Sequence, residues 1–230
     1  MSNQYSPTGF SLLPTVVKNL LIINGIMYLA DVVMGRFGIN LSNILGLHFF
    51  MASDFHPFQL LTYMFMHGNF THLFLNMFAL WMFGNTLENM WGPQRFLLFY
   101  ILCGLGAGLI QEGVQYVEYV TQLSGYQNVN TGSSIIPMAE YLNRMSTVGA
   151  SGAIYGLLLA FGMMFPNSLI YLYFFVPIKA KWFVIGYAAI ELFSGLAYPG
   201  DHVAHFAHLG GMLVGLIIIL IWKKKGKLYY

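Results

Sequence analysis

Six apolar runs dominate this chain of 230 residues. Several approach the roughly 20 residues that an α-helix needs to cross a bilayer. The chain is 57% hydrophobic and only 8% charged, whereas charged residues make up about a quarter of a soluble domain. The runs lie at residues 15–34, 71–87, 95–110, 151–165, 182–198 and 205–222. We therefore predict an all-α membrane protein, a bundle of six transmembrane helices with a long interfacial first outer loop.

The chain divides into one membrane domain and two short tails. We expect a cytoplasmic tail at 1–14, the transmembrane domain at 15–222 and a basic cytoplasmic tail at 223–230. The first run carries polar residues and no small-residue cleavage site follows it, so it is expected to be a retained helix rather than a signal peptide.

Cys103 is the one cysteine, which excludes an internal disulfide and a multi-cysteine metal site and favours a buried packing role.

The positions of the cationic residues predict the orientation. Short cytoplasmic loops of membrane proteins are enriched in Lys and Arg. With the N-terminus inside, only Arg36 and Arg144 fall on the outer side. The predicted cytoplasmic group is Lys18, Arg95, Lys179, Lys181, Lys223, Lys224, Lys225 and Lys227. Both termini are therefore expected to be cytoplasmic, in a cell (inner) membrane.

This orientation places every histidine on the outer side together with Ser151. The seven are His48, His56, His67, His72, His202, His205 and His208. The outer segments 35–70 and 112–148 are long, and the second must dip inward if Ser151 begins its helix below the surface. We expect an aqueous cavity above this serine. The apolar stretch 169–178 is too short to cross and is expected to lie at the interface.

Two glycine pairs predict which helices touch. Gly152 and Gly156 are four residues apart in one run, as are Gly211 and Gly215 in another. Such small-residue faces let transmembrane helices approach closely, although each pair alone is frequently only a packing feature. Because they begin just after Ser151 and His208, close packing is expected to bring these two side chains within hydrogen-bond reach.

A serine beside a histidine can act as a nucleophile with its base. The imidazole takes the hydroxyl proton and later returns it to the leaving amine. At a helix start, free backbone N–H groups can also face a developing oxyanion. The simpler reading makes Ser151 an N-cap and His208 an interfacial residue.

The second run adds two polar side chains on one helical face, His72 and Asn76. They are either polar contacts between helices or hydrogen-bond donors to an oxyanion. Tyr155 lies one turn below Ser151, where its ring could support an imidazole.

Three motifs in this order resemble the rhomboid family of intramembrane serine proteases. They are HLFLN at 72–76 with Gly84, Glu88 and Gly92; GASGAIYG at 149–156; and AHLGG at 207–211 with Gly215. The resemblance covers about 57–222 and implies a rhomboid-like bundle of six helices, a bacterial-type core. One departure is that residues 39–65 contain neither member of the Trp-Arg pair that some bacterial members carry in this loop.

The resemblance also implies roles for individual residues. Ser151 would be the nucleophile and His208 the general base, a dyad without an aspartate. His72, Asn76 and the backbone N–H of Ser151 would stabilise the oxyanion. Gly149, Gly152, Tyr155 and Gly211 would support this group, with the Tyr155 ring stacked on the histidine. The fifth helix would help to gate entry of the substrate.

The implied reaction is hydrolysis of a peptide bond in or near the transmembrane segment of a membrane protein, through an acyl-enzyme. The implied partners are such substrates and the lipid bilayer, with no nucleic acid, no metal and no cofactor. The implied substrate is a single-pass protein cut near the outer end of its span, after a small residue. Its identity and the oligomeric state stay open.

Two alternatives remain. One is a zinc-dependent membrane protein that uses the histidines, although the sequence shows no H-E-x-x-H helix and no evident acidic partner for them. The other is a non-catalytic relative that binds membrane clients. Glu191 is expected to make a structural hydrogen bond, Asp201 to cap a helix and His205 to line the mouth of the cavity.

Overall fold

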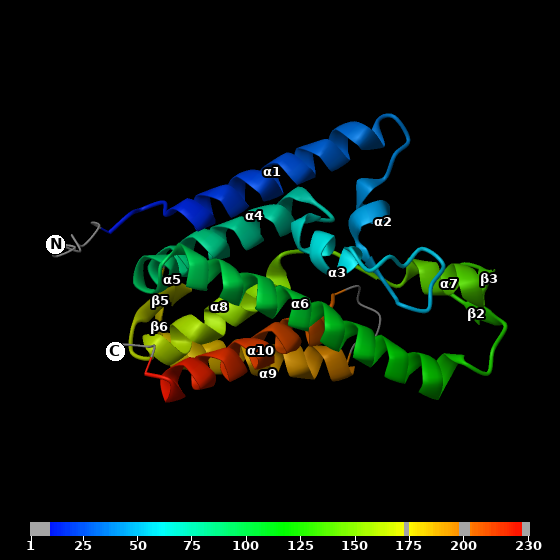
Figure 1. Cartoon of the computed structure of the whole chain (residues 1–230). Coiled ribbons are helices and arrows are strands. Elements are labelled where there is room, and N and C mark those ends of the chain that lie inside the picture. Colours follow the sequence, from blue (N-terminus) through cyan, green and yellow to red (C-terminus); the bar gives the residue numbers. More distant parts are fainter. Residues whose placement is uncertain (1–9, 173–174, 198–202, 227–230) are drawn as a thin grey trace.

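The computed structural model describes residues 10–172, 175–197 and 203–226, which form a bundle of helices with their long axes roughly aligned (Figure 1). Asp201 and His202, and the roles expected for them, lie outside these residues. The helices are α1 (Thr15–Gly35), α2 (Leu41–Leu45), α3 (Gln59–Thr62), α4 (Phe70–Ala79), α5 (Asn85–Trp91), α6 (Pro93–Glu118), α7 (Met138–Arg144), α8 (Ser151–Met164), α9 (Ala180–Ala197) and α10 (His205–Lys224). The 3₁₀ turn η1 (Tyr63–Phe65) and the π-helical turns η2 (Leu80–Gly84) and η3 (Tyr119–Leu123) lie between them.

Within the described residues, four helical segments are long and apolar enough to cross a membrane. They are Thr15–Gly35, Pro93–Leu123, Ala180–Ala197 and His205–Lys224. The other two predicted spans are helical as well. The second is the α4–η2–α5 segment, and the fourth is α8, whose 14 residues extend roughly 21 Å at 1.5 Å per residue. This is less than the ~30 Å hydrocarbon core of a bilayer.

The predicted boundaries need two corrections. The second span extends beyond residue 87, because α5 continues to Trp91 and the chain turns at Gly92, whose φ is +80°. Pro93 then occupies the first turn of α6, where its missing N–H has no helical partner to lose. The third span is also longer than 95–110, because helical structure extends to Leu123.

Three two-stranded antiparallel sheets form in segments that were expected to be loops or to lie at the interface. In the outer segment, β2 (Asn128–Asn130) pairs with β3 (Ile135–Pro137), and β1 (Leu47–His48) pairs with β4 (Ser146–Thr147) just before α8. The stretch expected at the interface forms β5 (Leu169–Leu172) and β6 (Val176–Lys179), paired antiparallel. Paired strands satisfy backbone groups that a loop near the membrane would leave exposed.

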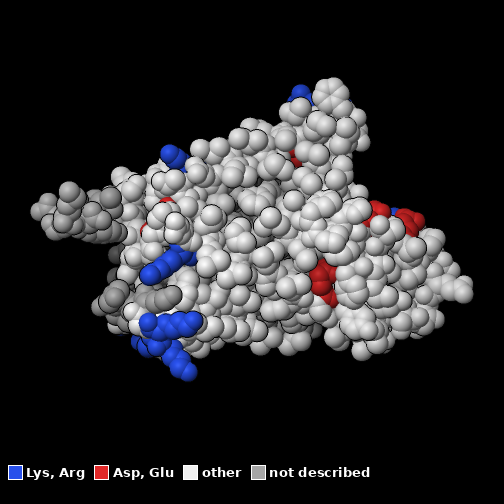
Figure 2. Space-filling model, in the orientation of Figure 1, with Lys and Arg blue, Asp and Glu red and all other residues white. Residues whose placement is uncertain are grey.

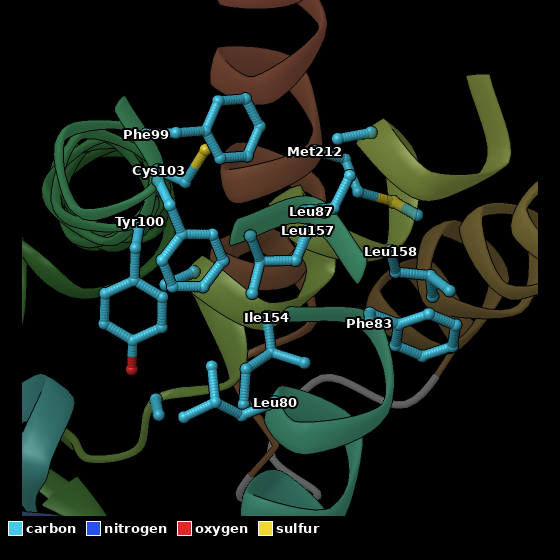
Figure 3. Packing of buried hydrophobic residues seen from close by; sticks show 14 of the residues in the cluster. Leu80, Phe83, Leu87, Phe99, Tyr100, Cys103, Ile154, Leu157, Leu158 and Met212 are labelled. Atoms are coloured by element: carbon cyan, nitrogen blue, oxygen red, sulfur yellow. The ribbon is translucent and has the colours of Figure 1, made fainter. Parts of the chain in front are cut away.

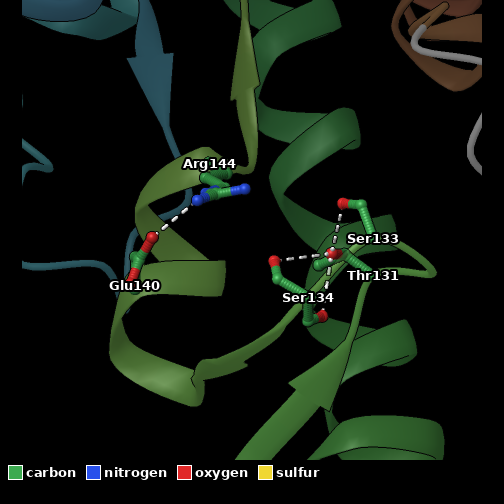
Figure 4. A network of polar contacts seen from close by, with 5 residues as sticks. All are labelled: Thr131, Ser133, Ser134, Glu140 and Arg144. Atoms are coloured by element: carbon green, nitrogen blue, oxygen red, sulfur yellow. Dashed lines mark hydrogen bonds and ion pairs between the residues drawn. The ribbon is translucent and has the colours of Figure 1, made fainter.

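The outer segment between η3 and β4 is held by local polar contacts. The Thr131 hydroxyl lies at hydrogen-bond distance from the side chains of Ser133 and Ser134, and Arg144 pairs with Glu140 along α7 (Figure 4). The Arg144–Glu140 pair is exposed, so it contributes little to stability.

The core lies where α6, α8 and α10 meet. Side chains from these helices and from the η2–α5 segment converge around Leu157 (Figure 3). Cys103 is fully buried there, in the packing position expected from the sequence. By contrast, α1 and α9 bury only a few of their apolar residues, as helices that face lipid would.

A buried carboxylate fixes the start of α1. Glu88 of α5 accepts hydrogen bonds from the backbone N–H groups of Val16 at 2.9 Å and Val17 at 2.7 Å. These groups have no partner within their own helix, and the positive end of the helix dipole favours a negative charge. The contact ties α1 to the segment that carries His72 and Asn76.

The first outer loop is anchored by Gln59 rather than by a Trp-Arg pair. The Gln59 side chain is buried, and its Nε2 donates to the carbonyl oxygens of Ile44 (3.1 Å) and Asp54 (2.9 Å). Its Oε1 accepts from the backbone N–H groups of His48 (3.3 Å) and His56 (3.1 Å). One side chain thus joins both halves of the loop.

We expect Gln59→Leu to destabilise this loop. The substitution keeps the size but leaves buried backbone groups unpaired, which costs about 1–3 kcal/mol of unfolding free energy. Thermal unfolding of the purified protein measures the loss. The exposed Gln122→Leu serves as the control, and equal midpoints for both variants would contradict the anchoring role.

Charge is distributed unevenly along the bundle. Lys and Arg side chains gather at the end where α1 begins and α10 ends, whereas acidic side chains on this face lie mostly toward the other end (Figure 2). The asymmetry agrees with the grouping of cations found in the sequence.

Candidate active site

Ser151 is the first residue of α8, and the backbone before it explains why the helix begins there. Gly149 has a φ of +128°, which L side chains rarely adopt, and its N–H donates to the carbonyl oxygen of Tyr63 at 2.9 Å. A Cβ at this position would lie 2.8 Å from the His72 ring. The position therefore requires glycine for both its conformation and the neighbouring imidazole.

The start of α8 leaves backbone donors available. The N-cap residue is Ala150, which offers no side-chain hydrogen bond, so Ser151 is not the N-cap. The first helical bond runs from the N–H of Ile154 to the carbonyl oxygen of Ala150. The preceding N–H groups, including that of Ser151, have no partner within the helix.

His208 approaches Ser151 from the first turns of α10. Its Nε2 lies 2.8 Å from the Ser151 Oγ, and both side chains are partly buried. This distance is that of a hydrogen bond between a hydroxyl donor and a ring nitrogen acceptor.

Glycine makes this approach possible. A Cβ at Gly211 would overlap the carbonyl oxygen of Gly152, and a Cβ at Gly215 would lie 3.3 Å from the Cα of Gly156. The two glycine faces expected from the sequence therefore pack against each other, backbone to backbone.

Tyr155 covers one face of the His208 ring. The two rings are 4.2 Å apart at their centroids and inclined by only 5°, so they are stacked. The stack restricts rotation of the imidazole and shields that face from solvent.

The other side of the site comes from α4. His72 packs against Gly149, and Asn76 is buried one turn below it, where its Nδ2 donates to the carbonyl oxygen of His72 at 3.1 Å. An amide nitrogen carries two hydrogens, so Asn76 retains a second donor. His67 lies beside His72, with ring centroids 5.1 Å apart, and burial lowers the pKa of His67 to about 4. His67 is therefore neutral at pH 7.

An acidic residue of α9 contacts the site, and the sequence does not predict this contact. Glu191 of α9 is only 6% exposed, and its Oε2 lies 2.9 Å from His208 Nδ1 and 2.6 Å from His205 Nδ1. Its Oε1 accepts a short hydrogen bond from the Tyr155 hydroxyl. The expected structural hydrogen bond of Glu191 is present. One expectation was wrong: the histidines do have an acidic partner, because His205 and His208 both contact Glu191.

One signal in the sequence pointed to Glu191. It is the only acidic residue in the run 182–198, and an ionisable residue in a transmembrane helix is a functional candidate by default. What the sequence does not show is the rotation of α9, which decides whether the carboxylate faces His208 or another neighbour.

The Glu191 carboxylate and the imidazoles of His205 and His208 form a group of three potential metal ligands. Their ligand atoms all lie within 4.8 Å of one another. Ligands at roughly 2.0 Å from a tetrahedral zinc stand about 3.3 Å apart, however, and two of these pairs are closer, at 2.6 and 2.9 Å. The arrangement fits shared protons better than a metal ion.

Comparison with known proteins identifies the family of this chain. The family model of the Rhomboid domain matches residues 54–225, which include all the residues of the site. The chain belongs to the rhomboid family. The fold is accordingly a rhomboid membrane fold, and the serine at the start of α8 and the histidine of α10 lie within the matched domain.

The relatives that match include proteins of a plant and of two bacteria, each 28–30% identical to this chain. RHOMBOID-like protein 12, mitochondrial, of Arabidopsis thaliana is 28% identical over 88% of this chain and 56% of its own length. Rhomboid protease AarA of Providencia stuartii is 30% identical over 69% of this chain and 53% of its own length. Putative rhomboid protease YdcA of Bacillus subtilis is 28% identical over 75% of this chain and 70% of its own length. The chain spans about half of the length of several relatives that it matches, with values from 38% to 56%.

Proposed function

We propose that this rhomboid-family protein is an intramembrane serine endopeptidase, with Ser151 as nucleophile and His208 as general base. The observation that carries the proposal is the 2.8 Å approach of His208 Nε2 to Ser151 Oγ across two apolar helices. A hydroxyl and an imidazole are both costly in a membrane bundle, which favours a functional pair over an incidental one. Relatives named as rhomboid proteases support the same class of reaction.

The proposed reaction runs in two halves. The Ser151 Oγ bonds to the scissile carbonyl carbon while its proton passes to His208 Nε2, and the carbonyl electrons move to oxygen. When the oxyanion collapses, the C–N bond breaks and the departing amine takes the proton from Nε2, which leaves an acyl-serine. Water then gives a proton to Nε2 and its oxygen to the acyl carbon. Collapse of this second intermediate returns the proton to Oγ and releases the carboxylic product.

The same geometry supplies donors for the oxyanion. In the proposed mechanism, the free N–H of Ser151 and the side chains of His72 and Asn76 approach the carbonyl oxygen from two helices. Preorganised donors of this kind stabilise charge that appears only in the transition state.

We expect Asn76→Ala to lower kcat by about 10²–10³-fold with little change in KM, the usual cost of losing one oxyanion donor. Steady-state cleavage of a transmembrane reporter in liposomes measures both constants. Thermal unfolding separates this loss from misfolding. A higher KM with kcat unchanged would show weaker substrate binding only and would remove Asn76 from the proposed oxyanion group.

The proposed substrates are single-pass membrane proteins cut near the outer ends of their spans. The short α8 supports this depth, because its 14 residues cannot reach both faces of the hydrocarbon layer with Ser151 at the surface. The exposed apolar side of α9 supports lateral entry of a substrate helix there. The grouping of Lys and Arg at the opposite end supports cytoplasmic termini and a site that opens outward, in a cell (inner) membrane.

Reconstitution tests the proposal. Purified protein in liposomes, given a panel of single-pass reporters with small residues at the outer end of the span, is expected to cut within or next to the span, as mass spectrometry of the products will show. Cleavage should persist in a strong chelator and stop with a serine-reactive fluorophosphonate. Reporter binding without cleavage or labelling would favour the non-catalytic alternative, and chelator-sensitive cleavage would favour a metal enzyme.

A further inference from the structure

The contacts of Glu191 point to a role in the reaction itself. The carboxylate lies between three side chains of two other helices: Tyr155 of α8, and His205 and His208 of α10. Only 8% of its side chain is exposed. A charge in such a place is costly unless it is paired, so the arrangement around it must favour the carboxylate.

The two nitrogens of His208 face two different partners. Nε2 lies 2.8 Å from Ser151 Oγ, and Nδ1 lies 2.9 Å from Glu191 Oε2. A carboxylate only accepts hydrogen bonds, so a hydrogen bond between these two atoms requires the imidazole proton on Nδ1. Nε2 is then unprotonated and can take the serine proton. The carboxylate thus selects the tautomer that the proposed reaction requires.

The Nδ1–Oε2 contact has the distance of an ion pair but not the direction of a straight hydrogen bond. His205 Nδ1, in contrast, meets both criteria at 2.6 Å on the same oxygen. A carboxylate oxygen can accept two hydrogen bonds, and catalytic hydrogen bonds in unliganded sites are often poorly aligned. The distance therefore carries more weight than the angle.

Tyr155 links these groups into one unit. Its ring stacks on His208 while its hydroxyl donates to Glu191 Oε1, so a single side chain fixes both the imidazole plane and the carboxylate. Movement of α9 would change the position of Glu191 with respect to His208. The contact is therefore formed only when α9 is packed against α8 and α10.

We propose that Glu191 is a positioning residue that acts through His208, which makes the catalytic group a Ser151–His208–Glu191 triad. The inference rests on the proposed peptidase function. The carboxylate holds the imidazole in its reactive tautomer and stabilises the imidazolium that forms when Ser151 loses its proton. It touches neither substrate nor the reacting atoms.

The test compares Glu191→Gln, Glu191→Asp and the wild type in liposomes. The variant E191Q keeps the shape but removes the negative charge, and kcat is expected to fall by about 10²–10⁴-fold with KM nearly unchanged. The variant E191D retains the carboxylate and is expected to recover part of the rate. Ser194→Ala, one turn along α9 and outside these contacts, is the matched control with wild-type kcat.

Active-site titration separates positioning from a purely structural role. A fluorophosphonate counts the sites that can react, so kcat is expressed per titrated site. The positioning role predicts that the rate per site falls in E191Q. An equal rate per site, with only fewer sites or a lower unfolding temperature, would overturn it.

Three further outcomes are also decisive. If the wild type labels at Ser151 and E191Q labels at the same rate, the triad is wrong while the proposed function stands. If the wild type neither labels nor cleaves, the proposed function fails and the triad with it. Loss of wild-type activity in a chelator, restored by Zn²⁺ alone, would replace the triad with a metal site.

Discussion

Ser151→Ala and His208→Ala are each expected to lower kcat by about 10⁴-fold or more. The serine variant loses the atom that bonds to the carbonyl carbon. The histidine variant loses the group that takes the Oγ proton 2.8 Å away, and no other ring nitrogen is described at that distance from the hydroxyl. Cleavage of a transmembrane reporter by reconstituted protein measures both losses.

The double variant sharpens this prediction. Because the two side chains act as one unit, removing both should cost little more than removing either one. His56→Ala is the matched control, since His56 is an exposed histidine of the first outer loop, and it should retain wild-type kcat. Additive losses, or full activity in either single variant, would contradict the paired roles of Ser151 and His208.

Gly211→Ala is expected to damage both stability and activity. The added Cβ overlaps the carbonyl oxygen of Gly152, and neither helix can yield without shifting its backbone. Overpacking of this kind costs about 1–3 kcal/mol. Any separation of α8 from α10 also lengthens the Ser151–His208 contact, so kcat should fall more than the loss of folded protein explains.

Gly113→Ala provides the matched control. Gly113 lies in α6 with no atom within 4 Å of an added Cβ, so alanine there should leave activity unchanged and favour the helix slightly. Thermal unfolding and activity per titrated site measure the two effects. Equal behaviour of the two alanine variants would show that close packing at Gly211 does not hold the site together.

The spans and the α8–α10 contact could be predicted because each depends on local composition. Apolar length predicts where a helix can cross a bilayer, and α1, α8 and α10 begin at the residues where their predicted runs begin. Glycine spacing predicted the helix pair because only residues without a Cβ allow backbones to touch.

The Glu191 contact could not be predicted in the same way. One carboxylate on a helix has no periodic partner, so its direction depends on how α9 is rotated against α8 and α10, which is a tertiary property. The anchoring of the first outer loop stayed open in the sequence for a related reason. Gln59 bonds to four backbone groups, and backbone partners leave no mark in the sequence.

The most direct test of the account is to find the residue that becomes covalently modified. Reconstituted wild-type protein is treated with a fluorophosphonate, digested and analysed by tandem mass spectrometry. One adduct is expected, on the Oγ of Ser151, formed slowly in His208→Ala and absent from Ser151→Ala and from unfolded protein. An adduct on another residue, or complete loss of reporter cleavage while Ser151 stays unmodified, would contradict the role of Ser151 as nucleophile.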